Sequence, residues 1–166
     1  MTWHAKCDMK VLALISGGKD SCYNAWICEK YGHEIVALGN LLPLEDDREE
    51  LDSYMYQTVG HGLIEAYSKC TGLPLFRRKI RGSSVNQDLI YEEGGEGSGD
   101  EVEDLMALVV YAKQHTPCIG AVASGAIASD YQRSRVERVC GRLGLVSLAY
   151  MWHEPQAKLL KDMVGS

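Results

Sequence analysis

The chain has 166 residues, of which 46% are hydrophobic and 24% are charged. This composition is that of an ordinary globular domain rather than a disordered or fibrous chain. A chain of this length buries about 70% of its unfolded surface, so it needs no disulfide or metal ion to fold. The sequence has no run of roughly 18 uncharged apolar residues and no apolar signal-peptide core. We therefore expect a soluble, cytoplasmic protein.

The net charge of −6 arises from two acidic windows, residues 45–52 and 92–104, which hold more than half of the 23 acidic residues. Outside these windows the basic residues outnumber the acidic ones. The windows are most simply interpreted as a solvated loop and a solvated helix start. The remaining chain keeps a positive balance that suits the binding of phosphates.

Strand-like and helix-like segments alternate along the chain, because short apolar runs are followed by longer segments that end at Gly or Pro. In chain order we expect a strand over residues 10–15, a helix over 21–31, a strand over 34–41, a helix over 53–70, a strand over 75–80, a flexible loop over 81–99, a helix over 101–114, a strand over 119–124, a helix over 130–143, a strand over 145–150 and a helix over 156–164. Repeated β-α units predict an α/β fold: a doubly wound, mainly parallel five-stranded sheet with helices on both faces. Residues 9–166 are expected to form this domain, after a disordered extension over 1–8.

The strongest chemical signal is the sequence SGGKDS at residues 16–21, between the first strand and the first helix. Its glycines let the backbone approach a ligand closely, and its amides can form an anion-binding nest at the helix start. This is not the Walker A pattern, which needs four residues between its first Gly and the Gly-Lys pair. The alternative is a Gly-rich turn that only caps the helix. The residues that we predict to bind a phosphate chain are Ser16, Gly17, Gly18, Lys19, Asp20 and Ser21.

The segment GAIASDYQRSRVE at residues 125–137 follows the fourth strand, at the sheet edge where ligands of such folds bind. Ser129 and Asp130 lie where the cap and the first turn of a helix are expected. Arginine suits planar oxyanions, which points to phosphates or an activated carboxylate. The alternative for the arginines is surface salt bridging, for example between Arg133 and Glu137. The residues predicted to bind here are Gly125, Ser129, Tyr131, Gln132, Arg133 and Arg135, with Arg133 and Arg135 catalytic together with Lys19 and Asp20.

Further candidates follow the second strand and open the third helix. Tyr54 and Tyr56 can stack on a base or line a substrate entrance, and the alternative is that they belong to the aromatic core. Glu103 and Asp104 can receive a substrate or hold Mg²⁺ beside the phosphates. Asp20 is the other candidate ligand, and the sequence does not choose between these carboxylates.

The six cysteines are scattered and form no C-x-x-C pair, which argues against a zinc site or a redox pair. We expect them to be small buried hydrophobic residues.

SGGKDS resembles the PP-loop of ATP pyrophosphatases. The segments SGGKDSCYN (16–24), LDSYMYQTVGH (51–61), GDEVEDL (99–105) and GAIASDYQRSRVE (125–137) together look like the diphthine–ammonia ligase family. The resemblance covers nearly the whole chain from Met9 onward. It implies the nucleotide-α-hydrolase type of Rossmann-like fold, with ATP and Mg²⁺ bound. It also implies a ligase that adenylates the carboxylate of diphthine on translation elongation factor 2, releases pyrophosphate and lets ammonium displace AMP to form diphthamide.

The sequence departs from the family at its end. The family continues with a Gly-Glu-Gly-Gly-Glu segment followed by an aromatic residue, Glu and Thr, and the similar run at residues 93–97 lacks that continuation. We therefore expect the ATP-binding N-terminal half of the family, truncated at its C-terminus. The alternative function is a catalytically inactive nucleotide-binding module or short isoform. A tRNA-thiolating PP-loop enzyme is a distant third, because paired cysteines and a strongly basic segment are missing, and neither a nucleic-acid nor a membrane partner is expected.

Overall fold

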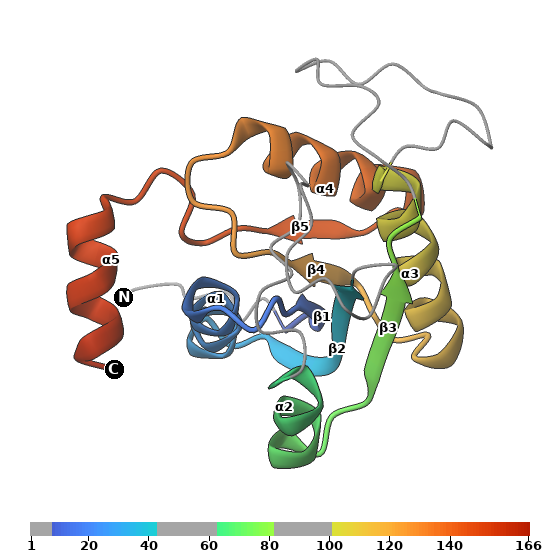
Figure 1. Ribbon diagram of the computed structural model, residues 1–166, viewed down its shortest axis with the longest axis horizontal. Helices are drawn as coiled ribbons and strands as arrows, with labels where there is room; N and C mark the ends of the chain where they lie inside the picture. Colours follow the sequence, from blue (N-terminus) through green and yellow to red (C-terminus); the bar gives the residue numbers. More distant parts are fainter. Residues whose placement is uncertain (1–7, 43–62, 82–100) are drawn as a thin grey trace.

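The computed structural model of this chain describes residues 8–42, 63–81 and 101–166 (Figure 1). Four predicted features lie wholly or partly outside these described residues: residues 1–7 of the extension expected over 1–8, the first part of the helix expected over 53–70, most of the loop expected over 81–99, and the two tyrosines Tyr54 and Tyr56. Within the three described ranges, no helix combines the length and the apolar character that a membrane crossing needs.

Five parallel strands form one sheet in the order β3-β2-β1-β4-β5. The strands are β1 (Lys10–Leu14), β2 (Glu34–Leu42), β3 (Leu75–Lys79), β4 (Ala121–Ala123) and β5 (Val146–Leu148). The chain adds β2 and β3 on one side of β1, and then β4 and β5 on the other side. This is the doubly wound arrangement, and it confirms the predicted fold class. Because the strand order reverses between β1 and β4, a ligand-binding crevice is expected at their carboxyl ends.

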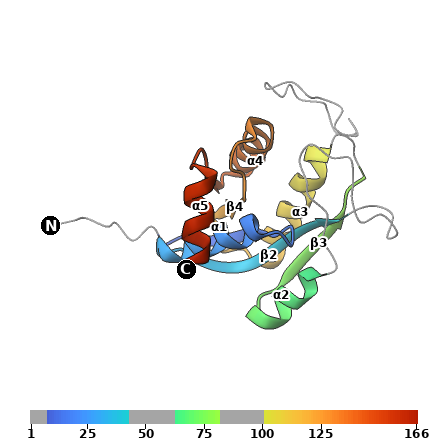
Figure 2. The same ribbon diagram turned by 60° about the vertical axis from the view of Figure 1, so that its left-hand side comes forward.

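Helices cover both faces of the sheet (Figures 1 and 2). The helices are α1 (Lys19–Lys30), α2 (Ile64–Thr71), α3 (Glu101–His115), α4 (Asp130–Leu143) and α5 (Gln156–Val164). Residues of α1 and α2 pack against one face, and residues of α3 and α4 pack against the other. In both views α5 lies beside α1.

The central strand β1 supplies both halves of the core. Its successive side chains point to opposite faces, so that Val11 joins the cluster around α1 whereas Leu12 joins the cluster around α3 and α4. Both side chains are completely buried. A strand that is buried on both faces is apolar at nearly every position. This explains why a short continuous apolar run was a reliable strand signal here.

The helices α4 and α5 have the predicted bounds, and the other elements differ at their ends. α1 begins at Lys19, two residues before the predicted start, so the last three residues of SGGKDS form its first turn. β5 ends at Leu148, before the predicted end, because the chain then turns. In that turn His153 has a φ of 57°, and its amide donates to the carbonyl of Ile127, 2.8 Å away. This bond joins the loop after β5 to the loop after β4.

Of the five cysteines that the structure describes, two are buried, two are exposed, and Cys22 is partly buried. Cys28 and Cys140 are buried as predicted, and burial raises the pKa of each thiol from 9.0 to about 12. Cys70 and Cys118 are exposed, so the prediction is wrong for these two. They lie near the ends of surface elements rather than on a face packed against the sheet.

The thiol environments give a first testable prediction. A thiol reagent at pH 8 is expected to label Cys70 and Cys118 in the folded protein and to spare Cys28 and Cys140, because the thiolate is the reactive form. Peptide mass spectrometry before and after unfolding in urea measures this, with Cys70 as the internal control. Rapid native labelling of Cys28 would contradict the prediction.

The two buried thiols also make stability depend on pH. Since both have a higher pKa in the folded chain, the stability they contribute is lost as the pH rises from 9 towards 12.

Candidate functional site

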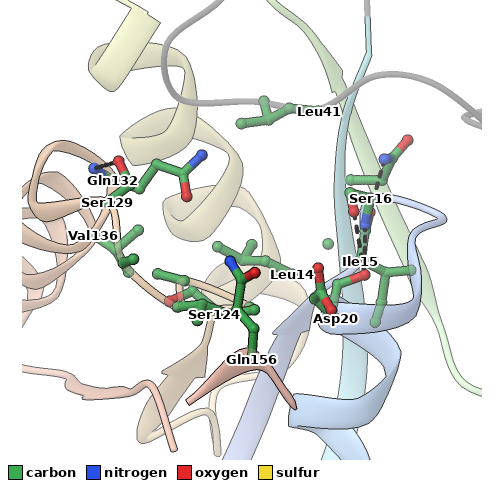
Figure 3. A pocket seen from close by; sticks show the side chains of 17 residues that line it. Leu14, Ile15, Ser16, Asp20, Leu41, Ser124, Ser129, Gln132, Val136 and Gln156 are labelled. Carbon is green, nitrogen blue, oxygen red and sulfur yellow. Dashed lines mark hydrogen bonds between the residues drawn. The ribbon is translucent and has the colours of Figure 1, made fainter. Parts of the chain in front are cut away.

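A cavity of about 320 Å³ opens at the carboxyl ends of β1, β2 and β4, where the strand order reverses (Figure 3). Its size and its mixed lining are typical of a site for a small molecule. Gln132 and Gln156 point into it from α4 and α5, across from Ser16 and Asp20. The residues that line it are Leu14, Ile15, Ser16, Asp20, Ser21, Gly39, Asn40, Leu41, Ser124, Gly125, Ala126, Ile127, Ala128, Ser129, Gln132, Val136 and Gln156.

The SGGKDS loop (residues 16–21) forms one wall and is closed by the hydroxyl of Ser21. This hydroxyl donates to the carbonyl of Gly18 at 3.0 Å and accepts from the amide of Ser16 at 3.2 Å. Gly17 has a φ of 87°, a conformation that glycine adopts without strain. Gly18 is the N-cap of α1 and offers the first turn no side-chain hydrogen bond. The amides at the start of α1 therefore remain suited to an anion.

Lys19 and Asp20 occupy the first turn of α1 and form an ion pair. The Lys19 ammonium lies 2.7 Å from Asp20 Oδ1, and the lysine side chain is 65% exposed. Asp20 lines the cavity, whereas Lys19 does not. The structure therefore places Lys19 beside the cavity, with its ammonium group at the end of a long flexible side chain. Binding of phosphate by Lys19 stays a prediction.

The loop after β4 forms the second wall and touches the first. A Cβ atom added at Gly125 would lie 2.9 Å from the amide nitrogen of Ser21 and 3.1 Å from the carbonyl carbon of Asp20. Because real Cβ atoms do not approach backbone so closely, the two loops can meet only through a glycine. Two motifs that lie about a hundred residues apart in the sequence are thus in direct contact.

Ser129 caps α4, as predicted. Its hydroxyl oxygen accepts from the amide of Gln132 at 3.2 Å, and Asp130 lies in the first turn. Ser129, Gln132 and Val136 line the cavity. Their spacing of three and four residues puts them on one face of the helix. Together with residues 125–128, this face is the part of the predicted segment that the structure brings to the site.

The other predicted residues of this segment lie away from the cavity. Arg133 forms a salt bridge with Glu137 at 2.6 Å, which is the alternative considered above for this arginine. Its guanidinium also lies 4.7 Å from the ring centre of Trp152. Arg135 is completely buried, and its guanidinium lies 3.3 Å from the ring centre of Tyr131. None of these side chains lines the cavity. One helical step is about 100°, so the neighbours of a cavity-facing residue point elsewhere.

Glu103 and Asp104 form intramolecular ion pairs on α3. Asp104 is buried and accepts from Arg78 Nε at 3.0 Å and from the amide of Arg81 at 2.7 Å. Glu103 pairs with Arg142 at 2.9 Å. Neither carboxylate lines the cavity. Their arrangement supports α3 and its contacts with β3 and α4, and we assign them no substrate.

Asp20 is the only carboxylate among the described residues that line the cavity. In the described ranges no three His, Cys, Asp or Glu side chains form a cluster that could hold a metal ion. Mg²⁺ commonly takes only one or two carboxylates and completes its coordination with phosphate oxygens. Asp20 therefore fits a magnesium ion that arrives with a nucleotide.

Sequence reasoning missed several lining residues, of which Asn40 and Gln156 are the most polar. Asn40 could have been found, because it is a polar residue inside an otherwise apolar strand and such a residue needs a reason. Gln156 is the first residue of α5, and only the position of α5 in the tertiary structure brings it to the site.

The sequence of this chain is similar to those of one protein family. Residues 9–147 match the family model described as "Diphthamide synthase N-terminal domain". A diphthine–ammonia ligase from Schizosaccharomyces pombe is 54% identical over 158 residues, which are 95% of this chain and 25% of that protein. A diphthine–ammonia ligase from Bos taurus is 53% identical over 160 residues, which are 95% of this chain and 58% of that protein.

The chain thus spans between a quarter and about three fifths of the length of these relatives. Among solved structures, a protein from Methanocaldococcus jannaschii described as a "predicted subunit of tRNA methyltransferase" has a TM-score of 0.49 at 15% identity, over 94% of this chain and 74% of that one. The match to the family model begins one residue before β1 and includes the SGGKDS loop, the loop after β4 and all of α4. The chain therefore belongs to the family of diphthamide synthase N-terminal domains.

Proposed function

We propose that this chain is the ATP-binding, carboxylate-activating part of a diphthine–ammonia ligase. The observation that carries the proposal is the cavity between the SGGKDS loop and the loop after β4, in a chain about half identical to proteins of that name. Uncapped amides at the start of α1 and the Ser16 hydroxyl offer hydrogen-bond donors to a phosphate chain. The opposite wall, with Gln132 and Gln156, is left for the rest of the nucleotide or for the carboxylate.

The proposed reaction has two steps. A carboxylate oxygen of diphthine attacks the α-phosphorus of ATP, the bond between that phosphorus and the bridging oxygen breaks, and pyrophosphate leaves. The nitrogen of ammonia, formed when ammonium gives up a proton, then attacks the acyl carbon of the adenylate. AMP departs with the electron pair of the broken bond, and a second nitrogen proton is lost to leave the amide. The protein substrate that we propose is translation elongation factor 2 carrying diphthine.

The chain's contribution to this chemistry is electrostatic and positional. Lys19 and the first-turn amides of α1 would neutralise the negative charge that builds up on pyrophosphate as it leaves. The hydroxyl of Ser21 holds the loop in shape through bonds that are already formed. Mg²⁺, when bound by Asp20 and phosphate oxygens, would supply further neutralising charge.

The second candidate is a nucleotide-binding module without ligase activity. It rests on one observation, which is that the chain spans only part of the length of its relatives. Residues outside this chain in those relatives could hold the protein substrate. In that case the nucleotide would bind here while ligation would need the remaining part.

Titration calorimetry with a non-hydrolysable ATP analogue and Mg²⁺ tests the shared part of both candidates. Ligation is then measured with diphthine-bearing elongation factor 2 and ammonium, as the conversion of carboxylate to amide by mass spectrometry. Saturable nucleotide binding with ammonium-dependent amide formation is the expected result. Binding without amide formation selects the second candidate, and a folded chain that binds no nucleotide contradicts both.

A further inference from the structure

A row of side-chain hydrogen bonds crosses three strands at the carboxyl edge of the sheet. Glu65 Oε1 accepts from Arg77 Nη1 at 3.2 Å, and Arg77 Nε donates to Asn40 Oδ1 at 3.2 Å. Asn40 Nδ2 then donates to the carbonyl oxygen of Ile15 at 2.9 Å. Asn40 on β2 and Arg77 on β3 are direct partners in the strand register. The row therefore runs sideways from β3 to the residue that precedes the SGGKDS loop.

Asn40 is held in one orientation by its two neighbours. Asn40 is 2% exposed, so a hydrogen bond that is lost here leaves a buried polar group unsatisfied, which is costly. The amide oxygen faces a donor, Arg77 Nε, and the amide nitrogen faces an acceptor, the Ile15 carbonyl. A flipped amide would set oxygen against oxygen and N–H against N–H, which loses both bonds. Arg77 thus determines which atom Asn40 presents to Ile15.

Ile15 is fixed to β2 through both of its backbone polar groups. Its amide donates to the carbonyl of Gly39 at 2.8 Å, and its carbonyl accepts from Asn40. The first of these bonds continues the ladder between β1 and β2, whereas the second is made by a side chain. The direction in which the chain leaves β1 is therefore set one residue before Ser16. A small rotation of the Ile15 carbonyl would move the following loop.

We propose that Asn40 is a positioning residue for the SGGKDS loop and that Arg77 acts on this loop through Asn40. The proposal deepens the proposed function, because it rests on that loop as the phosphate-binding wall. Asn40 lines the cavity, but Arg77 does not. Among the contacts of the described residues, the path from Arg77 to the cavity runs through the amide of Asn40. An indirect role of Arg77 therefore predicts a different result from direct binding of the nucleotide by this arginine.

A double-mutant cycle on nucleotide binding tests the proposal. Arg77→Met removes the donor to Asn40 and is expected to weaken binding of a non-hydrolysable ATP analogue about tenfold, as for the loss of one charged hydrogen bond. Asn40→Ala is expected to weaken it at least as much. The double variant is expected to bind no more weakly than Asn40→Ala alone, because both changes break the same connection. Additive effects, or wild-type affinity in Arg77→Met, would overturn the proposal.

The matched control is Arg142→Met, which also removes a partly exposed arginine from a carboxylate, that of Glu103. Neither of these two residues lines the cavity. It is expected to leave binding unchanged. Asn40→Asp adds a finer test, since it keeps the acceptor for Arg77 and loses the donor to Ile15. It is expected to weaken binding as Asn40→Ala does, and wild-type affinity in this variant counts against the proposal.

Amide hydrogen exchange in the nucleotide-free protein gives a readout that does not depend on the proposed function. The amides of residues 16–21 are expected to exchange faster in Arg77→Met than in the wild type or in Arg142→Met. If the wild-type chain binds no nucleotide, the proposed function fails while this measurement still decides the positioning role. Arg77 is partly exposed, so its variant also serves if Asn40→Ala does not fold. Unchanged exchange in the folded Arg77→Met protein would overturn the proposal.

Discussion

Lys19→Ala is expected to lower the release of pyrophosphate from ATP by roughly 10²–10³-fold, the usual cost of removing one fixed donor from developing charge. Lys19 is the first residue of α1, next to Asp20 in the cavity wall, and its exposed side chain forms an ion pair with that carboxylate. A phosphate chain entering the cavity brings more negative charge than one carboxylate. The ammonium group is therefore expected to turn from Asp20 towards the phosphates.

The measurement is a coupled pyrophosphate assay with diphthine-bearing substrate. Lys30→Ala is the matched control, because it removes a lysine from the other end of the same helix, where the side chain lies over the ring of Trp26. Its activity is expected to equal that of the wild type. Unchanged pyrophosphate release from Lys19→Ala would rule out the assigned role of the lysine.

Gly125→Ala is expected to destabilise the fold by about 1–3 kcal/mol, the typical cost of overpacking. The added Cβ would lie within 3.1 Å of three backbone atoms of Asp20 and Ser21, and none of them belongs to a side chain that can move aside. The loop after β4 must then separate from the start of α1. Because these two segments form adjoining walls of the cavity, nucleotide affinity is expected to fall together with stability.

Urea unfolding and calorimetric titration measure these two effects. Gly141→Ala is the control, since a Cβ at this position in α4 meets no atom within 4 Å. Alanine is a better helix former than glycine, so Gly141→Ala is expected to stabilise the protein by roughly 0.5–1 kcal/mol and leave binding unchanged. Wild-type stability and affinity in Gly125→Ala would show that the contact between the two loops is not needed.

The fold could be predicted because local signals and global topology agree in this chain. The apolar run around Val11 and Leu12 has the length and the flanking glycines of a strand buried on both faces. The bounds of α4 follow from a cap at Ser129 and from Gly144, whose φ of 64° ends the helix. The ends of β5 could not be predicted, because the residues up to Tyr150 are as apolar as a strand and only tertiary contacts turn the chain there.

Only those residues of the candidate site that belong to a sequence motif could be predicted. SGGKDS could be identified from the order of its residues and from its place directly after a strand. The helical segment after β4 contains polar residues on every side, so residue type could not distinguish Gln132, which faces the cavity, from Arg133 and Arg135, which do not. That distinction depends on the rotation of α4 about its axis, and packing against the sheet determines it. Asn40 has its partner 37 residues away on β3, at a distance where sequence spacing carries no information.

The contact at Gly125 also has a consequence for how the protein folds. The SGGKDS loop lies early in the chain, but it meets the loop after β4 only when β4 has paired with β1. This pairing closes a loop of about a hundred residues. Contacts of such long range form slowly, because the entropy of loop closure is lost before they contribute stability. An intermediate that contains only the first three strands would have half a cavity. A ligand of this cavity therefore binds the completed fold alone, and by mass action it protects the chain from unfolding.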